Sequence, residues 1–226
     1  MTPSNPTQET HGSRRRGRPA KTDGTRDKTR ARLIRRGMEV LTEQGYACTG
    51  INDILTSVGV PKGSFYHYFS SKEDFARAVI DAYADYFAQK LDRWLLNETR
   101  APLDRLRDFI ADAKDGMARY EFRRGCLIGN LGQELGASND GFRTSLEMVF
   151  KDWQARVEHC LLDARSTGDI AADADCTRLA EFFWIGWEGA ILRAKLTHSN
   201  TPLDVFATTF FSSLETRAPE FKEPIQ

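Results

Sequence analysis

Apolar side chains recur at helical spacing along most of the chain, from about residue 25 to residue 216. The clearest example starts at Leu103, where apolar positions as far as Tyr120 lie three or four residues apart and so share one face of an α-helix. No segment shows the convincing alternation of apolar and polar residues that indicates a half-buried β-strand. The pattern predicts an all-α fold with about nine helices.

Glycine, proline and capping residues mark the expected ends of these helices. Gly45 and Gly59 are expected to end the first two helices, and Pro61 lies in the first turn of the third. The run of residues 70–74, Ser-Ser-Lys-Glu-Asp, presents two overlapping capping boxes that predict a long fourth helix. One pairs Ser70 with Glu73 and the other pairs Ser71 with Asp74. The other expected helices cover residues 29–44, 51–58, 61–69, 103–120, 127–135, 140–165, 175–197 and 202–216.

Composition divides the chain into four parts. Residues 1–24 are rich in Pro, Gly, Ser, Thr and Arg with almost no bulky apolar side chains, which predicts a disordered basic arm. Residues 25–71 contain the three short N-terminal helices, residues 72–218 the longer ones, and residues 219–226 a tail. A chain of 226 residues that is 40% hydrophobic is long enough for one small module and one larger domain with its own core.

The formal net charge of zero hides a separation of charge along the chain. Residues 1–70 contain 12 Lys and Arg against 6 Asp and Glu, whereas the remainder contains 20 against 26. Most of the basic side chains of the first part lie between Arg14 and Arg36. A basic end joined to a more acidic remainder is typical of a protein that binds nucleic acid at that end.

The cysteine and histidine positions indicate neither disulfides nor a metal site, because the residues of both types are scattered without a Cys-x-x-Cys pair. No segment approaches the roughly 20 apolar residues of a membrane-spanning helix, and the N-terminus lacks the apolar run of a secretory signal. We therefore expect a soluble, cytoplasmic protein with no metal, no cofactor and no membrane partner. The four cysteines are Cys48, Cys126, Cys160 and Cys176.

The second and third expected helices have the spacing of a helix-turn-helix, and Gly59 can adopt the left-handed conformation that the turn needs. Phe65 and Phe69 lie one turn apart and are expected to pack on the second helix. The outer face of the third helix then carries small, polar and aromatic side chains that fit the major groove of DNA. This face comprises Lys62, Gly63, Ser64, Tyr66 and His67.

The run VPKGSFYHYFSSKE at residues 60–73 closely resembles the signature of TetR-family repressors, and residues 45–46 and 51–54 match the family pattern at the right distances. The resemblance implies a homodimer that pairs through its last two helices, binds a palindromic operator and is released by a small effector. It also implies that Gly63 and Ser64 lie nearest the bases of DNA. The side chains that it implies contact DNA, mostly at phosphates, are Lys62, Tyr66, His67 and Lys72. The alternative role for Tyr66, His67 and Tyr68 is ordinary packing between the third and fourth helices.

The N-terminal arm contains a second candidate DNA contact. Arg15-Arg16-Gly17-Arg18-Pro19 resembles an AT-hook, whose extended core lies in the narrow minor groove of A·T-rich DNA. In that motif the guanidinium groups of Arg16 and Arg18 would enter the groove. The alternative is a basic tail that binds DNA without sequence preference.

Two C-terminal segments, residues 122–131 and 183–190, resemble the branch of the TetR family that responds to acrylate and to reactive electrophiles. In the electrophile-responsive members the matching cysteine is paired with a lysine, and these positions are Cys126 and Lys195 here. The resemblance therefore implies an effector such as acrylate or a related unsaturated acid or aldehyde.

The residues around Cys126 suggest a reactive thiol. Arg123 and Arg124 precede it, and it lies at an expected helix start, so that both the guanidinium charges and the helix dipole favour the thiolate. The same cations could bind the carboxylate of a small acid, as could Lys195. The alternative for Cys126 is a buried, inert cysteine.

Aromatic residues and small residues in the last two helices suggest a pocket and a dimer interface. Trp184, Trp187 and Tyr120 could line an effector pocket or fill the core, and the sequence is compatible with both. The eighth helix carries Gly186, Gly189, Ala190 and Ala194 as a small surface, and the ninth carries an apolar face that an isolated protomer would expose. That face comprises Phe206, Phe210, Phe211 and Leu214.

Two other functions compete with that of a repressor. A thiol-dependent enzyme would use Cys126 as the nucleophile with His159 or His198 as the base, but no Cys-His signature supports this and we expect no enzyme activity. An architectural DNA-binding protein would use the basic arm without sensing any ligand.

Overall fold

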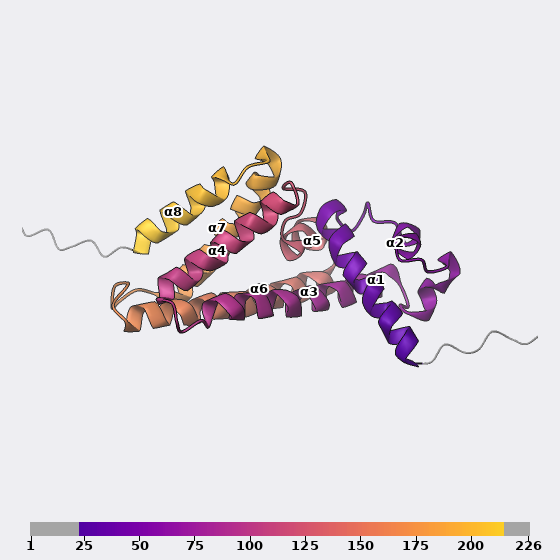
Figure 1. The fold of residues 1–226 in the computed structure, drawn as a ribbon, viewed down its shortest axis with the longest axis horizontal. Coiled ribbons are helices and arrows are strands. Elements are labelled where there is room, and N and C mark those ends of the chain that lie inside the picture. Colours follow the sequence, from indigo (N-terminus) through magenta and orange to yellow (C-terminus); the bar gives the residue numbers. More distant parts are fainter. Residues whose placement is uncertain (1–22, 215–226) are drawn as a thin grey trace, which may run out of the picture.

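The computed structural model describes residues 23–214, and every regular element in that range is a helix (Figure 1). The predicted all-α class and the predicted nine helices are confirmed for these residues, although one of the nine, η1, is a 3₁₀ helix. None of the described helices has the length and apolar character to cross a membrane. The helices are α1 Asp23–Gln44, α2 Ile51–Ser57, η1 Lys62–His67, α3 Lys72–Leu95, α4 Pro102–Arg119, α5 Leu127–Leu135, α6 Asp140–Ser166, α7 Cys176–Thr197 and α8 Thr201–Leu214.

The start of the first helix differs from the expected boundary. Helix α1 begins at Asp23 rather than near Thr29, so the last two residues of the expected arm are helical. Helix α8 is described as far as Leu214. The possible AT-hook, with Arg16 and Arg18, and the expected tail lie outside the described residues, and the domain boundaries stay a prediction.

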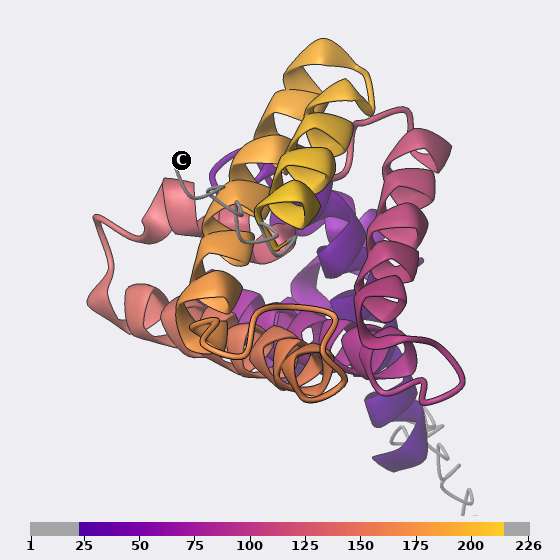
Figure 2. The same cartoon turned by 90° about the vertical axis from the view of Figure 1, so that its left-hand side faces the viewer.

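The long helices α3 and α6 lie side by side along the molecule, with α1, α2 and η1 at one end (Figure 1). Helix α7 packs on both α6 and α8, while α4 lies against α3 and α6 (Figure 2). The short helix α5 contacts α1, α3 and α6 at the junction of the two parts. Helix α5 is therefore placed to join the N-terminal helices to the rest of the molecule.

Helix α3 begins at a cap formed by three side chains. Ser71 Oγ accepts a hydrogen bond from Asp74 N at 3.0 Å, as the capping box predicts. The Asp74 carboxylate accepts from Ser70 N at 2.8 Å, and this bond holds the pKa of Asp74 below its ordinary value. The expected pairing of Ser70 with Glu73 is therefore wrong, and Glu73 forms an ion pair with Arg77 instead.

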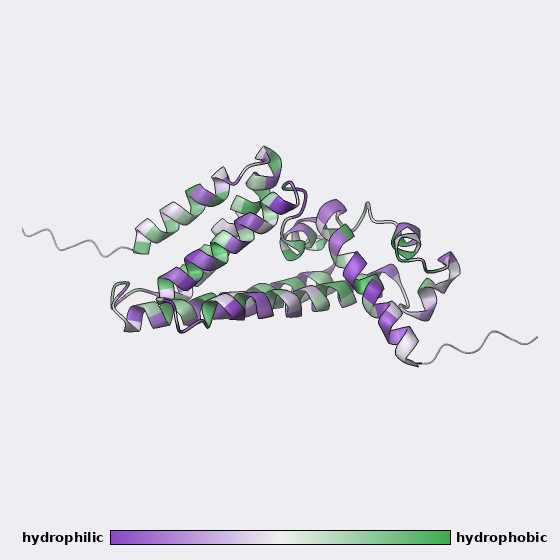
Figure 3. Cartoon of the chain, viewed as in Figure 1, coloured by the Kyte–Doolittle hydropathy of each residue, from purple (hydrophilic) through white to green (hydrophobic). Residues whose placement is uncertain are grey.

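The core of the larger part is rich in aromatic rings. The Trp153 ring lies 4.4 Å from Phe87 and 5.0 Å from Trp184, between centroids. The long helices each carry apolar and polar residues around their axes (Figure 3), as amphipathic helices packed on one side do. One continuous apolar cluster runs from α1 to α8.

The expected exposed face of the last helix is buried inside the protomer. Phe210 is fully buried and packs on Phe183 of α7, with ring centroids 5.2 Å apart. Phe206 lies directly over Gly186, where any Cβ would overlap its ring. The small surface of α7 thus receives α8 of the same chain. Phe210 and Leu214 are buried and Phe206 and Phe211 are half-buried, so the expectation that this face is left exposed for a partner is wrong.

Candidate functional site

The helix-turn-helix is anchored by one buried phenylalanine. Phe65 in η1 is 2% exposed, and its ring centroid lies 5.5 Å from that of Phe69 and 5.9 Å from that of Phe75 at the start of α3. Gly59 adopts the expected left-handed conformation, with φ of +66°, in the turn before η1. The predicted orientation of the third helix is therefore confirmed.

The opposite face of η1 is open to solvent. Tyr66 is 73% exposed. Tyr68 is partly buried and packs against the core, which agrees with the alternative role of ordinary packing for this residue. The remaining residues of this face are Lys62, Gly63 and His67, which are exposed, and Ser64, which is half-buried.

Basic side chains near this face have protein partners. Arg26 donates to the carbonyl of His67 at 2.8 Å, and Arg32 donates to the carbonyl of Val58 at 2.7 Å. The ammonium of Lys72 lies 4.4 Å from the ring centroid of Tyr46, a cation–π contact that fixes its position near η1. Part of the basic surface of α1 thus holds the helix-turn-helix together.

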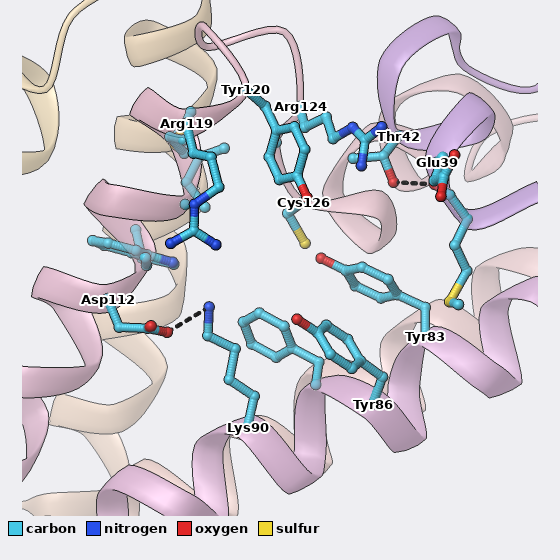
Figure 4. A pocket seen from close by; sticks show the side chains of 18 of the residues that line it. Glu39, Thr42, Tyr83, Tyr86, Lys90, Asp112, Arg119, Tyr120, Arg124 and Cys126 are labelled. Atoms are coloured by element: carbon cyan, nitrogen blue, oxygen red, sulfur yellow. Dashed lines mark hydrogen bonds and ion pairs between the residues drawn. The ribbon is translucent and has the colours of Figure 1, made fainter. Parts of the chain in front are cut away.

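A cavity of about 510 Å³ lies where α1 meets the larger part of the molecule (Figure 4). Helices α1, α3, α4 and α7 and the loop before α5 form its walls, and its volume falls in the range of small-molecule sites. The side chains of Tyr83, Tyr86 and Lys90 enter it from α3, opposite Arg119 and Tyr120 (Figure 4).

The lining of the cavity carries more positive than negative charge. The ammonium of Lys90 lies 2.7 Å from the Asp112 carboxylate. Burial alone would raise the pKa of Asp112, but the hydrogen bond and charge of Lys90 hold it below its ordinary value. An anionic ligand is therefore favoured over a cationic one. The basic lining residues are Arg35, Lys90, Arg93, Arg119 and Arg124, and the acidic ones are Glu39, Asp112 and Glu188.

The thiol of Cys126 lines the cavity but is not the thiolate that the sequence suggested. Cys126 is 5% exposed and caps α5, its sulfur accepting from Gly129 N at 3.4 Å. Burial, and then the nearby Glu188, raise the pKa of this thiol well above its ordinary value. The expected help from Arg123 does not reach it, because Arg123 is exposed and faces Glu121 at 3.7 Å.

Lys195 lies beside Gly125, the residue before Cys126. Its side chain packs on Gly125, where a Cβ would lie 2.9 Å from Lys195 Cδ. Burial lowers the pKa of Lys195, yet the charged group that raises the pKa of Cys126 is Glu188. The predicted pair is thus brought into one neighbourhood, and its role in sensing stays a prediction.

The two tryptophans of α7 face different cavities. Trp187 lines the cavity that contains Cys126, while Trp184 lines a second one of about 490 Å³ between α5, α6 and α7. Both indoles are almost fully buried, and Trp187 stacks on Phe183 at 5.9 Å between centroids. They are core residues that also form cavity walls, so the two alternatives weighed for them coexist.

Glu188 is a cavity residue that the sequence analysis missed. It lines both cavities, and its Oε1 is buried without a hydrogen-bond partner among residues 23–214. Burial raises the pKa of Glu188 to about 7, against a smaller lowering by a hydrogen bond from Cys126. The sequence feature that could have identified it is that Glu188 is the single charged residue in the otherwise apolar run of residues 183–190.

Four hydrogen bonds made by three side chains tie the end of α1 and the turn after it to α5 and the loop before α5. Glu134 accepts hydrogen bonds from Tyr46 N at 2.6 Å and Ala47 N at 2.5 Å. Asn130 donates to the carbonyl of Thr42 at 2.9 Å. Arg124 Nε donates to Glu43 at 2.7 Å. The wall of the cavity and the helix-turn-helix part are thus directly connected.

Two family profiles match the chain. "Bacterial regulatory proteins, tetR family" covers residues 33–79, and "Tetracyclin repressor-like, C-terminal domain" covers residues 102–210. This chain belongs to the TetR family of transcriptional regulators. Repressors of this family bind DNA and small-molecule effectors as dimers.

Several relatives have similar sequences over nearly their full length. The chain is 52% identical to the transcriptional regulator AcuR of Cereibacter sphaeroides over 91% of its own length and 94% of AcuR. It is 34% identical to the transcriptional repressor DhaR of Mycobacterium sp., over 84% of this chain and 93% of DhaR. It is 26% identical to the repressor NemR of Escherichia coli, over 80% of this chain and 90% of NemR.

Solved structures confirm the fold. A regulatory protein TetR from Rhodobacter sphaeroides is 52% identical, with a TM-score of 0.79 over 82% of this chain and 98% of that one. The reduced form of E. coli NemR is 25% identical, with a TM-score of 0.74 over 83% of this chain and 98% of that one.

Proposed function

We propose that this regulator is a homodimeric repressor that binds a palindromic operator and is released by a small carboxylate such as acrylate. The observation that carries the proposal is the predominantly basic cavity between α1 and the larger part of the molecule, because a ligand there contacts both parts. We call this larger part, α3 to α8, the effector-binding part. The cations offered to the carboxylate are Lys90, Arg119 and Arg124, whereas Arg123 and Lys195 are not in the lining of this cavity. As a DNA-binding regulator, the protein is proposed to act in the cytoplasm.

The dimer is proposed to form through an apolar stripe on α7. Phe182, Ile185, Leu192 and Leu196 are exposed, and together with Gly189 they lie three or four residues apart, so these positions share one face of the helix. Among the described residues, a Cβ built on Gly189 in the middle of this stripe would meet nothing within 4 Å, which lets a partner helix approach closely. Val205 of α8 is 61% exposed and extends the same apolar surface to the last helix. Pairing of this stripe with its copy buries it about a two-fold axis.

The DNA contacts are proposed to come from the open face of η1. Replacing Tyr66 with alanine is expected to weaken operator binding about tenfold, because a side chain that positions the helix against a phosphate is lost. Replacing Lys62 with alanine is expected to weaken binding on all sequences and to make the salt dependence shallower by about one unit. Fluorescence anisotropy with a labelled operator at several salt concentrations measures both.

The control for these variants is Lys151→Ala, which removes an exposed lysine from α6. It should leave affinity and salt slope unchanged, and circular dichroism should show the same helix content for all three variants. Wild-type affinity and slope in both Tyr66→Ala and Lys62→Ala would remove η1 from the DNA-binding surface.

The effector is proposed to bind reversibly. Acrylate is expected to release the operator from wild-type protein and from Cys126→Ser alike, because a buried thiol with a raised pKa is a poor nucleophile. Operator binding is measured with increasing acrylate, and the intact mass of each protein is recorded afterwards. A protein mass increased by one acrylate, with loss of the response in Cys126→Ser, would instead establish covalent capture by the thiol.

The two competing functions have less support. The relatives are transcriptional regulators, and Cys126 lacks the thiolate character that a cysteine nucleophile needs. A purely architectural DNA-binding protein has no use for a charged cavity against α1. Repeated turnover of an electrophile would favour the enzyme. Operator binding that no small acid changes would favour the architectural protein.

A further inference from the structure

One ion pair crosses from the wall of the cavity to the DNA-binding part. Arg124 lies in the loop before α5 and Glu43 in the last turn of α1, and Arg124 Nε is 2.7 Å from Glu43 Oε1. The two side chains are 24% and 30% exposed, so water screens their attraction only in part. Two residues farther along, Gly45 ends α1 with φ of +78°. The pair therefore holds the C-terminal end of α1.

Arg124 is positioned to meet a ligand as well as Glu43. It lines the cavity, and its guanidinium carbon lies 4.0 Å from the ring centroid of Tyr120, which stacks beside it (Figure 4). Within residues 23–214, the only hydrogen bond that the guanidinium makes is the one from Nε to Glu43. A guanidinium has five N–H donors in a planar fork, so four are left for a carboxylate.

The other paired cations of the cavity differ from Arg124 in where their counter-charge lies. Lys90 and Arg93 of α3 both face Asp112 of α4, at 2.7 Å and 3.8 Å. A ligand that captures either of them leaves α1 in place. Among the ion pairs of cavity cations in the described part of the chain, the pair of Arg124 with Glu43 reaches α1 from the effector-binding part.

We propose that a carboxylate effector competes with Glu43 for Arg124, and that loss of this ion pair frees the end of α1 and lowers the affinity for the operator. This inference rests on the proposed function and adds the residue pair that couples the cavity to DNA. The physical cause is repulsion, because two carboxylates at one guanidinium disfavour each other's charged form and position. The contact of Asn130 with Thr42 in α1 and those of Glu134 with Tyr46 and Ala47 just after α1 remain, so the DNA-binding part swings without detaching.

The proposal predicts opposite effects on effector binding for the two members of the pair. Glu43→Gln is expected to lower operator affinity about fivefold and to raise acrylate affinity by the same factor, since the competitor is gone and coupling between two ligands is reciprocal. Arg124→Gln is expected to lower operator affinity to a similar extent but to weaken acrylate binding, because it removes the ligand's own contact.

The experiment uses the full chain and acrylate as the probe. Calorimetry measures acrylate binding to each DNA-free protein, and anisotropy measures operator binding without acrylate. The matched control is Asp108→Asn, which removes the ion pair with Arg100 inside the effector-binding part and should change neither affinity. If Arg124→Gln has a lowered helix content, Arg124→Lys replaces it. Lysine keeps the positive charge but lacks the planar guanidinium donors, so this variant should lose less acrylate affinity than Arg124→Gln.

The outcomes separate this inference from the function on which it rests. If wild-type protein binds acrylate and is released by it, but Glu43→Gln binds acrylate no more tightly, the competition is overturned and the repressor function stands. If wild-type protein binds the operator but neither acrylate nor propionate, the proposed effector class fails and the inference fails with it. If Glu43→Gln binds acrylate more tightly and Arg124→Gln binds it more weakly, while both lose operator affinity, the competition and the proposed function are both supported.

Discussion

Replacing Trp153 with alanine is expected to lower the free energy of unfolding by about 3–5 kcal/mol. The side chain is fully buried in α6, and its ring meets Phe87 of α3, Phe150 of α6 and Trp184 of α7. Alanine removes this apolar surface and leaves a cavity that the surrounding helices cannot fill without moving. Urea denaturation at one fixed protein concentration measures the change, because dimerisation also contributes to stability.

The control is Met148→Ala on the same helix, where the side chain is 60% exposed and the expected change is within about 0.5 kcal/mol. Trp153→Phe should lose less than Trp153→Ala, because Trp153 Nε1 is a buried donor without a partner among the described residues and phenylalanine has no such donor. A loss below about 1 kcal/mol for Trp153→Ala would mean that the core closes over the site.

The second large effect is a dependence of stability on pH that originates at Glu188. The pKa of its carboxyl rises from the ordinary value of 4.5 to about 7 on folding, so between these values the folded protein binds more protons than the unfolded chain. Its contribution to stability must therefore fall as the pH rises from about 4.5 through 7. By pH 8 the buried charge is expected to cost about 3 kcal/mol.

Glu188→Gln removes this titration while keeping the shape of the side chain. The variant should be more stable than wild-type protein at pH 8 by up to that amount, and the difference should shrink towards pH 5. Comparing urea midpoints of the two proteins between pH 5 and pH 8 subtracts the histidines and other groups that they share. Glu147→Gln, at an exposed position of α6, is the control. Parallel curves for Glu188→Gln and wild-type protein would show that Glu188 is charged in the folded protein throughout.

Local patterns in the sequence were sufficient for the helices and for which face of η1 is open to solvent. The periodicity of apolar residues, Gly59 in the turn and the cap at Ser71 act within a few residues of chain, and each has the predicted role in the structure. The orientation of η1 also follows locally, because Phe65 and Phe69 must face the same neighbour. The predicted α-helical geometry of η1 was wrong, since its short run of residues forms a 3₁₀ helix.

Features that depend on which helices meet were decided only by the tertiary structure. An apolar face must be covered, but the sequence does not say by what, and the face of α8 with Phe210 turned out to pack on its own α7. Arg124 and the helix start at Cys126 suggested a thiolate, but Glu188 and the burial of the thiol come from helices distant in the chain and reverse the direction of its pKa. The pair of Arg124 with Glu43 has the same origin, because charges far apart in sequence meet only when the helices that carry them have packed.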